Sequence, residues 1–221
     1  MSQGIRATFD HEFDAIRQSL HEMSELIDAA IGSAMEALNE QSSKMAKKII
    51  ESDAQINRCR FEIQEACLAI IATQQPAARD LREIVAILYM VVELERIGDY
   101  AAGIAKTVIL MKEEPLLKTF KKIPRMGEIA RHMLQDVMLA FTTRDVEAAR
   151  KVAERDSEVD ELYDDSIHRL IKVMIKEPEM VTRCTYLSWC AHNLERIADR
   201  VTNITEQIIF MTTGEMSELN A

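Results

Sequence analysis

The sequence predicts an all-α protein, a tandem duplication of an antiparallel three-helix bundle with six long helices. Apolar residues recur at helical spacing along nearly the whole chain, and Gly (6) and Pro (4) are scarce among its 221 residues. Two segments at an offset of 100 residues are also similar to each other. β-Sandwiches and barrels need many turns rich in Gly and Pro, and dinucleotide-binding folds need a Gly-rich loop, so long helices are favoured over both.

The first bundle contains three helices whose ends are marked by polar residues and a proline. Apolar residues at i, i+3 and i+4 predict a first helix that ends near Leu38. Ser42 or Ser43 can cap a second helix, because a serine side chain accepts a hydrogen bond from an N–H group at a helix start. Pro76 ends that helix and allows a third to begin. The second and third helices are expected to end near residues 75 and 111.

The second bundle repeats this order after a linker at residues 112–118. Thr142 and Thr143 can cap its second helix, and Pro178 separates the second helix from the third. The expected helices cover 124–141 and 144–176, and a last one ends at 213. Short turns make neighbouring helices antiparallel, so the predicted domains are two bundles, residues 1–113 and 114–221.

Composition and charge make several classes of partner poor candidates. The formal net charge is −10, both halves are acidic and no basic block occurs, so nucleic acid and an anionic membrane surface are poor partners. The longest apolar run, 84–92, is far shorter than the roughly 20 residues that span a bilayer. The N-terminus lacks the order of a signal peptide, and four cysteines without a CxxC are expected to be reduced. We expect a cytoplasmic protein that meets a membrane only through partners.

A carboxylate motif occupies the same place in both halves. The pentapeptide ERIGD at 95–99 is matched by ERIAD at 195–199, and the surrounding segments share eight identities at an offset of 100. The two carboxylates of each motif lie one turn apart on one helix face, where like charges repel by a few tenths of a kcal/mol. A solvated face is the simpler explanation of a single pair. Agreement between two otherwise diverged copies favours a shared function.

The second helix of each half carries matching polar residues. Asp53 and Asn57 align at an offset of 103 with Asp156 and Asp160. Six of the ten residues from 156 to 165 are acidic, and a solvated face explains some of them. Facing carboxylate pairs from two helices also form a cage of hard oxygen ligands suited to Fe, Zn, Mn or Mg.

Together these segments resemble the PhoU family of phosphate-signalling regulators over essentially the whole chain. Residues 75–82 (QPAARDLR) followed by 93–99 (ELERIGD) are similar to the family signature, and 193–199 (NLERIAD) is similar to its degenerate second copy. Residues 53–57 (DAQIN) match the family's Asp-x-x-Ile-Asn. The resemblance implies two three-helix bundles side by side, with metal ions or multinuclear clusters at the (Glu/Asp)-x-x-x-Asp motifs.

The resemblance also implies two sets of metal ligands. They are Asp53, Glu95 and Asp99 in the first half, and Asp156, Asp160, Glu195 and Asp199 in the second. Asn57 replaces a carboxylate in the first set and is a weaker ligand, so the first site is expected to be poorer in metal. His192 lies one turn before Glu195, but the first copy has Val92 there, so we interpret His192 as an ordinary polar-face residue.

The function that the resemblance implies is negative regulation of the phosphate-starvation response, without catalytic residues. The implied partners are the ATPase subunit of a phosphate ABC transporter, a membrane sensor histidine kinase and a second copy of the chain. Two alternatives are a metal-free helical adaptor and a carboxylate-bridged di-iron protein. The di-iron alternative is disfavoured because it requires Glu-x-x-His, whereas Gly98 and Ala198 follow Glu95 and Glu195 by three residues.

Overall fold

The computed structural model describes residues 2–111, 121–216 and 218–219, with side chains from residue 7 onward. The linker predicted at 112–118 lies outside the described residues. The helices are α1 (Ser2–Glu40), α2 (Ser43–Gln74), α3 (Ala78–Met111), α4 (Lys122–Thr143), α5 (Val146–Ala153), α6 (Asp156–Lys176), the short 3₁₀ helix η2 (Pro178–Met180) and α7 (Val181–Thr213). No strand occurs among the described residues, which confirms the all-α class.

Capping and chain reversal explain where the helices of the first half begin and end. The Ser42 side chain accepts a hydrogen bond from the backbone N–H of Met45 at 3.4 Å, as predicted for the start of α2. Gln75 ends α2 in the left-handed conformation at φ 49°. Pro76 follows, and α3 begins at Ala78.

The second half departs from the predicted boundaries in two places. Asp145 caps α5 by accepting from the backbone N–H of Ala148, whereas Thr142 and Thr143 donate to carbonyls within α4, so the predicted threonine cap was wrong. The predicted fifth helix is also interrupted at residues 154–155, which divides it into α5 and α6.

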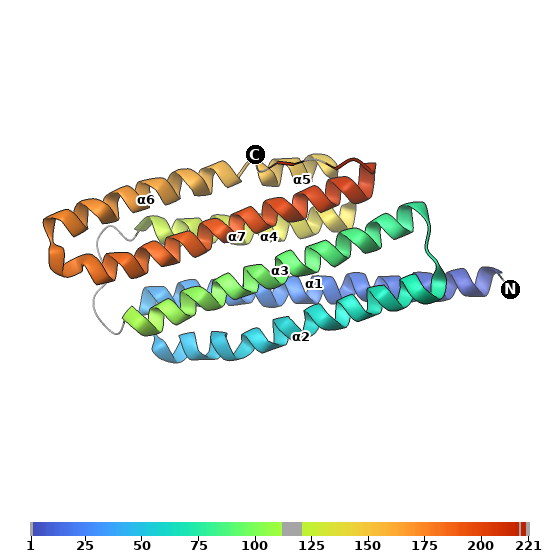
Figure 1. Ribbon diagram of the computed structural model, residues 1–221, viewed down its shortest axis with the longest axis horizontal. Coiled ribbons are helices and arrows are strands. Elements are labelled where there is room, and N and C mark those ends of the chain that lie inside the picture. Colours follow the sequence, from blue (N-terminus) through green and yellow to red (C-terminus); the bar gives the residue numbers. More distant parts are fainter. Residues whose placement is uncertain (1, 112–120, 217, 220–221) are drawn as a thin grey trace.

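The two halves meet along α3 and α7, which lie side by side and antiparallel at the centre of the molecule (Figure 1). α1 and α2 pack against α3, and α4, α5 and α6 pack against α7. Two contacts fix the register: Asn203 donates to Glu93 at 3.0 Å, and Asn193 lies against Gly103. The offset of 100 exchanges these two contacts, so α3 and α7 are related by an approximate two-fold axis beside Gly98 and Ala198.

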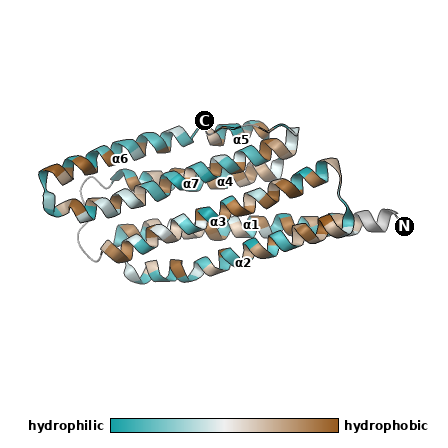
Figure 2. Cartoon of the chain, in the orientation of Figure 1, coloured by the Kyte–Doolittle hydropathy of each residue, from teal (hydrophilic) through white to brown (hydrophobic). Residues whose placement is uncertain are grey.

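One apolar core runs through both halves. Hydrophobic and hydrophilic residues are interspersed along the helices, as Figure 2 shows. Ile27 of α1, Leu94 of α3 and Ile204 of α7 are fully buried in the same cluster. Each such side chain stabilises the fold by about 1.5–3 kcal/mol relative to an exposed one. The core therefore holds α3 and α7 rigidly, and the carboxylate motif of each lies on this rigid pair.

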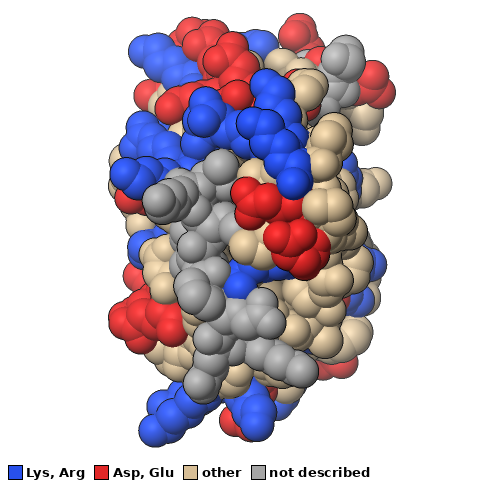
Figure 3. Space-filling model, turned by 90° about the vertical axis from the view of Figure 1, so that its left-hand side faces the viewer, with Lys and Arg blue, Asp and Glu red and all other residues tan. Residues whose placement is uncertain are grey.

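The outer surface carries charges of both signs. At the end where α6 turns into α7, Lys and Arg side chains are interspersed with Asp and Glu (Figure 3). Within the described residues, no helix is both long and apolar enough to cross a membrane.

Candidate metal centres

The first carboxylate motif lies on α3 where α2 crosses closely. Ile56 of α2 packs on Gly98, and a Cβ at that position would lie only 3.1 Å from the Ile56 Cδ1 atom. The same Cβ would lie 3.8 Å from the Asp53 Oδ1 atom. Glycine thus allows the close approach that brings Asp53 next to the motif, where the family resemblance had grouped it.

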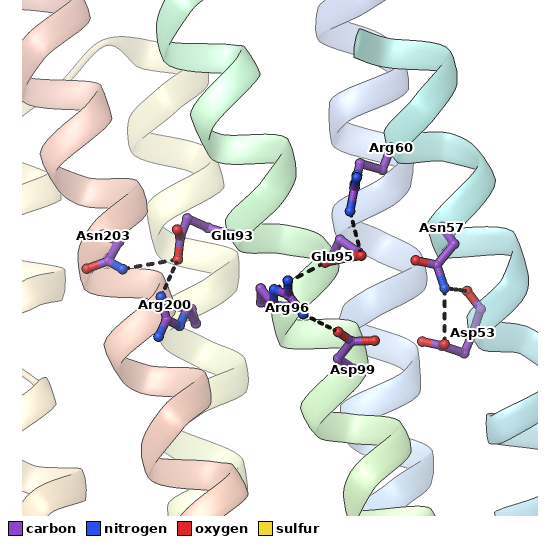
Figure 4. Close-up of polar contacts among 9 residues, drawn as sticks. All are labelled: Asp53, Asn57, Arg60, Glu93, Glu95, Arg96, Asp99, Arg200 and Asn203. Carbon is purple, nitrogen blue, oxygen red and sulfur yellow. Dashed lines mark hydrogen bonds and ion pairs between the residues drawn. The ribbon is translucent and has the colours of Figure 1, made fainter.

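Glu95 is neutralised by two guanidinium groups. Its side chain is buried, and Arg60 of α2 donates from Nη1 to Oε1 at 2.7 Å (Figure 4). The Arg96 Nε atom lies 3.6 Å from the other carboxylate oxygen. A buried carboxylate is costly without such partners, so this pairing explains how Glu95 is accommodated in its ionised form.

The remaining residues of the first site are also paired. Arg96 donates from Nη1 to Asp99 at 3.1 Å, and Asn57 donates to the Asp53 Oδ2 atom at 3.2 Å (Figure 4). Burial raises the pKa of Asp53, and the nearby Asp99 carboxylate raises it further. The structure therefore brings all four predicted residues of this site into one neighbourhood, where arginines and Asn57 engage most of their polar atoms. The Glu95 Oε2 atom is buried and accepts no hydrogen bond.

The second site combines the start of α6 with the motif on α7. Asp156 lies in the first turn of α6, where the helix dipole favours a negative charge. Its Oδ1 atom is buried without a hydrogen bond, and so is the Oε2 atom of Glu195. His192 Nδ1 lies 3.4 Å from that Glu195 oxygen, and Arg196 pairs with Asp199 at 2.5 Å.

Carboxylates of the second site perturb one another. The pKa of Asp156 is raised to about 7, first by burial and then by Asp160, Asp199 and Glu195. Burial and Asp199 raise the pKa of Asp160, and they are also the two largest causes that raise the pKa of Glu195. The predicted residues Asp156, Asp160, Glu195 and Asp199 therefore form one electrostatic cluster.

The two sites differ in their suitability for a cation. In the first site Arg60 and Arg96 pair with Glu95 and Asp99, and the positive charge of Lys106 acts on Asp53. The four carboxylates of the second site have Arg196 and the imidazole of His192 as close cationic or basic contacts in the described residues. With their present side-chain positions, no three Asp, Glu, His or Cys residues in the described ranges are placed to hold one ion. The second set nevertheless fits a hard cation, because its four carboxylates outnumber its cationic partners and two of their oxygens are buried without a hydrogen bond, against one such oxygen, Glu95 Oε2, in the first set. The first set does not fit, because Arg60 already neutralises Glu95.

Arg60 is the residue that the sequence reasoning missed. It follows Asp53 by seven residues, or two helical turns, and therefore lies on the same face of α2. The offset of 103 that aligns the second helices pairs Arg60 with Tyr163. That alignment contained the signal, but only the coordinates show which carboxylate the guanidinium reaches.

Comparisons with known proteins agree with the fold and with the duplication. A family profile described as "PhoU domain" matches residues 20–108 and again 123–208. The "Phosphate-specific transport system accessory protein PhoU homolog" of Aquifex aeolicus is 38% identical over 205 residues, covering 93% of this chain and 93% of that protein. The "Phosphate-specific transport system accessory protein PhoU" of Escherichia coli K12 is 32% identical, covering 97% of this chain and 89% of that protein.

Solved structures give the same result. The crystal structure of PhoU from Pseudomonas aeruginosa superposes with a TM-score of 0.90 at 34% identity, covering 94% of this chain and all of that one. The phosphate transport system regulatory protein PhoU from Streptococcus pneumoniae also gives a TM-score of 0.90, at 31% identity, covering 95% of this chain and 99% of that one. Both the sequence and the three-dimensional arrangement of the duplicated bundle therefore place this chain in the PhoU family.

Proposed function

We propose that this protein is an accessory regulator of phosphate uptake that represses the phosphate-starvation response. One observation carries the proposal: likeness to phosphate-specific transport accessory proteins extends over nearly the whole chain, with both copies of the repeat matched. A relative of known structure is itself described as a phosphate transport system regulatory protein. We assign this protein a regulatory role rather than an enzymatic one.

The proposed partners are the ATPase subunit of a phosphate ABC transporter and a membrane sensor histidine kinase. In this proposal a cytoplasmic homodimer links the two, so that the kinase stays inactive while phosphate is being imported. The relatives' description as transport-system accessory proteins supports association with the transporter. The kinase and the dimer are expectations that come from the family resemblance.

Cation binding by the acidic cluster is the second part of the proposal. Asp156, Asp160, Glu195 and Asp199 support it, because four carboxylates crowd together while buried oxygens of two of them accept no hydrogen bond. Fe, Zn, Mn and Mg are all compatible with oxygen ligands. A bound cation would supply the positive charge that offsets this crowding and would hold α6 against α7.

A deletion strain of the source organism tests the regulatory role. Alkaline phosphatase expression in phosphate-rich medium is expected to rise on deletion and to return to the parental level on complementation with the intact gene. Wild-type expression in the deletion strain would contradict the proposal. Complementation with Asp156→Asn/Glu195→Gln separates the two parts, because full repression by this variant would leave a metal-free adaptor as the better description.

A further inference from the structure

We propose that the two carboxylate motifs have diverged, so that Arg60 takes the place of a cation at the first and only the second is open to a metal ion. This division rests on the cation binding proposed above and assigns it to one half of the chain. It is carried by the contacts of Arg60, by the residue that replaces it in the second half and by the balance of charge at each site.

Arg60 is built into the first site rather than lying loosely on the surface. Its side chain is 24% exposed, and the Glu95 side chain that it contacts is 9% exposed. The guanidinium carbon lies 4.7 Å from the centre of the Phe61 ring, which holds the group from a second side. The guanidinium occupies the Oε1 atom of Glu95, so a metal ion bound to this carboxylate would lie close to a fixed positive charge that repels it.

Tyr163 occupies the corresponding place in the second half and carries no positive charge. It follows Asp156 by seven residues, as Arg60 follows Asp53. Its ring centre lies 6.1 Å from that of His192, and Glu195 acts on it electrostatically, so it faces the second cluster. Arg60 beside Glu95 and Tyr163 beside Glu195 therefore occupy equivalent positions but differ by one full positive charge.

The balance of charge at the two sites differs in the same direction. Arg60 and Arg96 offset two of the three negative charges of the first site. In the second site Arg196 offsets one of four, and the His192 imidazole contacts Glu195. A divalent cation would leave the second site near neutrality and would make the first site positive.

Titration of the full-length chain with Mn²⁺ tests the division, after chelator treatment and dialysis. Calorimetry and the Mn²⁺ paramagnetic resonance signal both count bound ions without any activity assay. We expect one tight equivalent per chain, lost in Glu195→Gln/Asp199→Asn and kept in the matched variant Glu95→Gln/Asp99→Asn. Two tight equivalents, one of them lost in the Glu95 variant, would overturn the division while leaving metal binding intact.

Exchange of the two distinguishing residues tests the role of Arg60 directly. Arg60→Tyr is expected to add a second equivalent, whereas Arg60→Lys keeps the charge and is expected to leave the count at one. Tyr163→Arg is expected to weaken the original site by at least about tenfold. Circular dichroism checks that each variant is folded. If Arg60→Tyr does not fold, Arg60→Gln replaces it as the variant that removes the positive charge.

Each remaining outcome is also decisive. An unchanged count in both folded Arg60→Tyr and folded Arg60→Gln would refute Arg60 as the group that closes the first site. No binding by the wild type or by any variant would refute the proposed metal site, and the division of roles would fail with it. In that case the regulatory role would still be tested separately by the deletion strain.

Discussion

Asp156 is the single residue whose protonation is most sensitive to its surroundings. Its counterpart Asp53 accepts a hydrogen bond from Asn57, whereas the Asp156 Oδ1 atom is buried without one among three further carboxylates. The pKa of Asp156 is accordingly raised from the ordinary 3.8 to about 7. The raised pKa of Asp156 therefore makes the second cluster responsive to protons near neutral pH as well as to cations.

The metal-free protein is expected to become less stable as the pH rises from about 4 to 7. Between these pH values the Asp156 carboxyl stays protonated in the folded protein but loses its proton in the unfolded chain. The contribution of Asp156 to the free energy of unfolding is therefore complete below pH 4 and is lost by about pH 7. Asp156→Asn cannot ionise and is expected to exceed the wild type in stability at pH 8 by about 2 kcal/mol, a figure discounted for partial exposure. The gain disappears near pH 4.

Urea denaturation at several pH values, with chelator present, measures this difference. Glu161→Gln, an exposed position on the same helix, is the matched control and is expected to show no such trend. A difference between Asp156→Asn and the wild type that stays constant from pH 4 to pH 8 would contradict the assignment of the raised pKa to this residue.

Residue identities in the acidic sites could be predicted from the sequence, but their pairing could not. Periodicity and the internal repeat singled out these residues, and the family resemblance grouped Asp53 with Asp99 and Asp156 with Asp199; the structure places both groups close together. The neutralisation of Glu95 by Arg60 depends on how far α2 slides along α3 and on which rotamer the arginine adopts. Neither quantity is encoded in the pattern of apolar and polar residues.

At the scale of helices, a buried ion network joins the two halves at one end. Glu83 of α3 is only 2% exposed, and Arg17 of α1 donates to it at 2.7 Å. Arg144, which ends α4 in the left-handed conformation at φ 54°, pairs with the other Glu83 oxygen. Three helices from both halves therefore depend on one carboxylate.

Arg144→Met is expected to destabilise the protein by about 2 kcal/mol, because it leaves a buried carboxylate with one cationic partner instead of two. The substitution keeps an unbranched apolar stem and removes the guanidinium group with its charge and its donors. Urea unfolding at pH 7 gives the magnitude. Arg125→Met is the control, since the ion pairs of Arg125 with Glu128 and Glu158 in the described part of the chain are exposed, and a loss of at most about 0.5 kcal/mol is expected. Equal losses in the two variants would refute the importance of the network.

The helix boundaries show what local sequence can and cannot predict. Pro76, Pro178 and Ser42 are strong local signals, and the corresponding ends were predicted correctly to within a few residues. The interruption between α5 and α6 carries no Gly or Pro. It consists of tight turns in which the backbone N–H of Arg155 donates to the Val152 carbonyl and the backbone N–H of Glu158 donates to the Arg155 carbonyl. The Arg155 side chain donates to Asp136 of α4 at 2.7 Å. This break therefore has no Gly or Pro signal in the local sequence, and Arg155 ties it to α4.

For the whole molecule, the contact between α3 and α7 determines how the two halves behave together. Glu93 receives hydrogen bonds from Asn203 and Arg200 across this contact, and fully buried side chains of both helices lie in one core. The domain division at 113 and 114 remains a prediction from the repeat. The buried apolar residues of both halves form one shared core, and neither half has a sizeable separate core.

We therefore expect both halves to unfold in one cooperative transition. Trp189, the only tryptophan, is 48% exposed and reports on the second half, and Tyr89 is its counterpart on α3. Trp189→Phe/Tyr89→Trp moves the fluorescent reporter to the first half. Urea midpoints from fluorescence of either protein and from far-ultraviolet circular dichroism should coincide. Separate midpoints for the two reporters would show that the halves are independent domains.

The unequal division of the duplicated motif is the central claim about the molecule as a whole, and anomalous diffraction tests it most directly. Crystals grown with Mn²⁺ and measured at the manganese absorption edge would locate each bound ion. The expected map has one peak per chain, between α6 and α7 beside Asp156 and Glu195, and none beside Glu95. A peak between α2 and α3 with Arg60 turned away from Glu95 would contradict the claim.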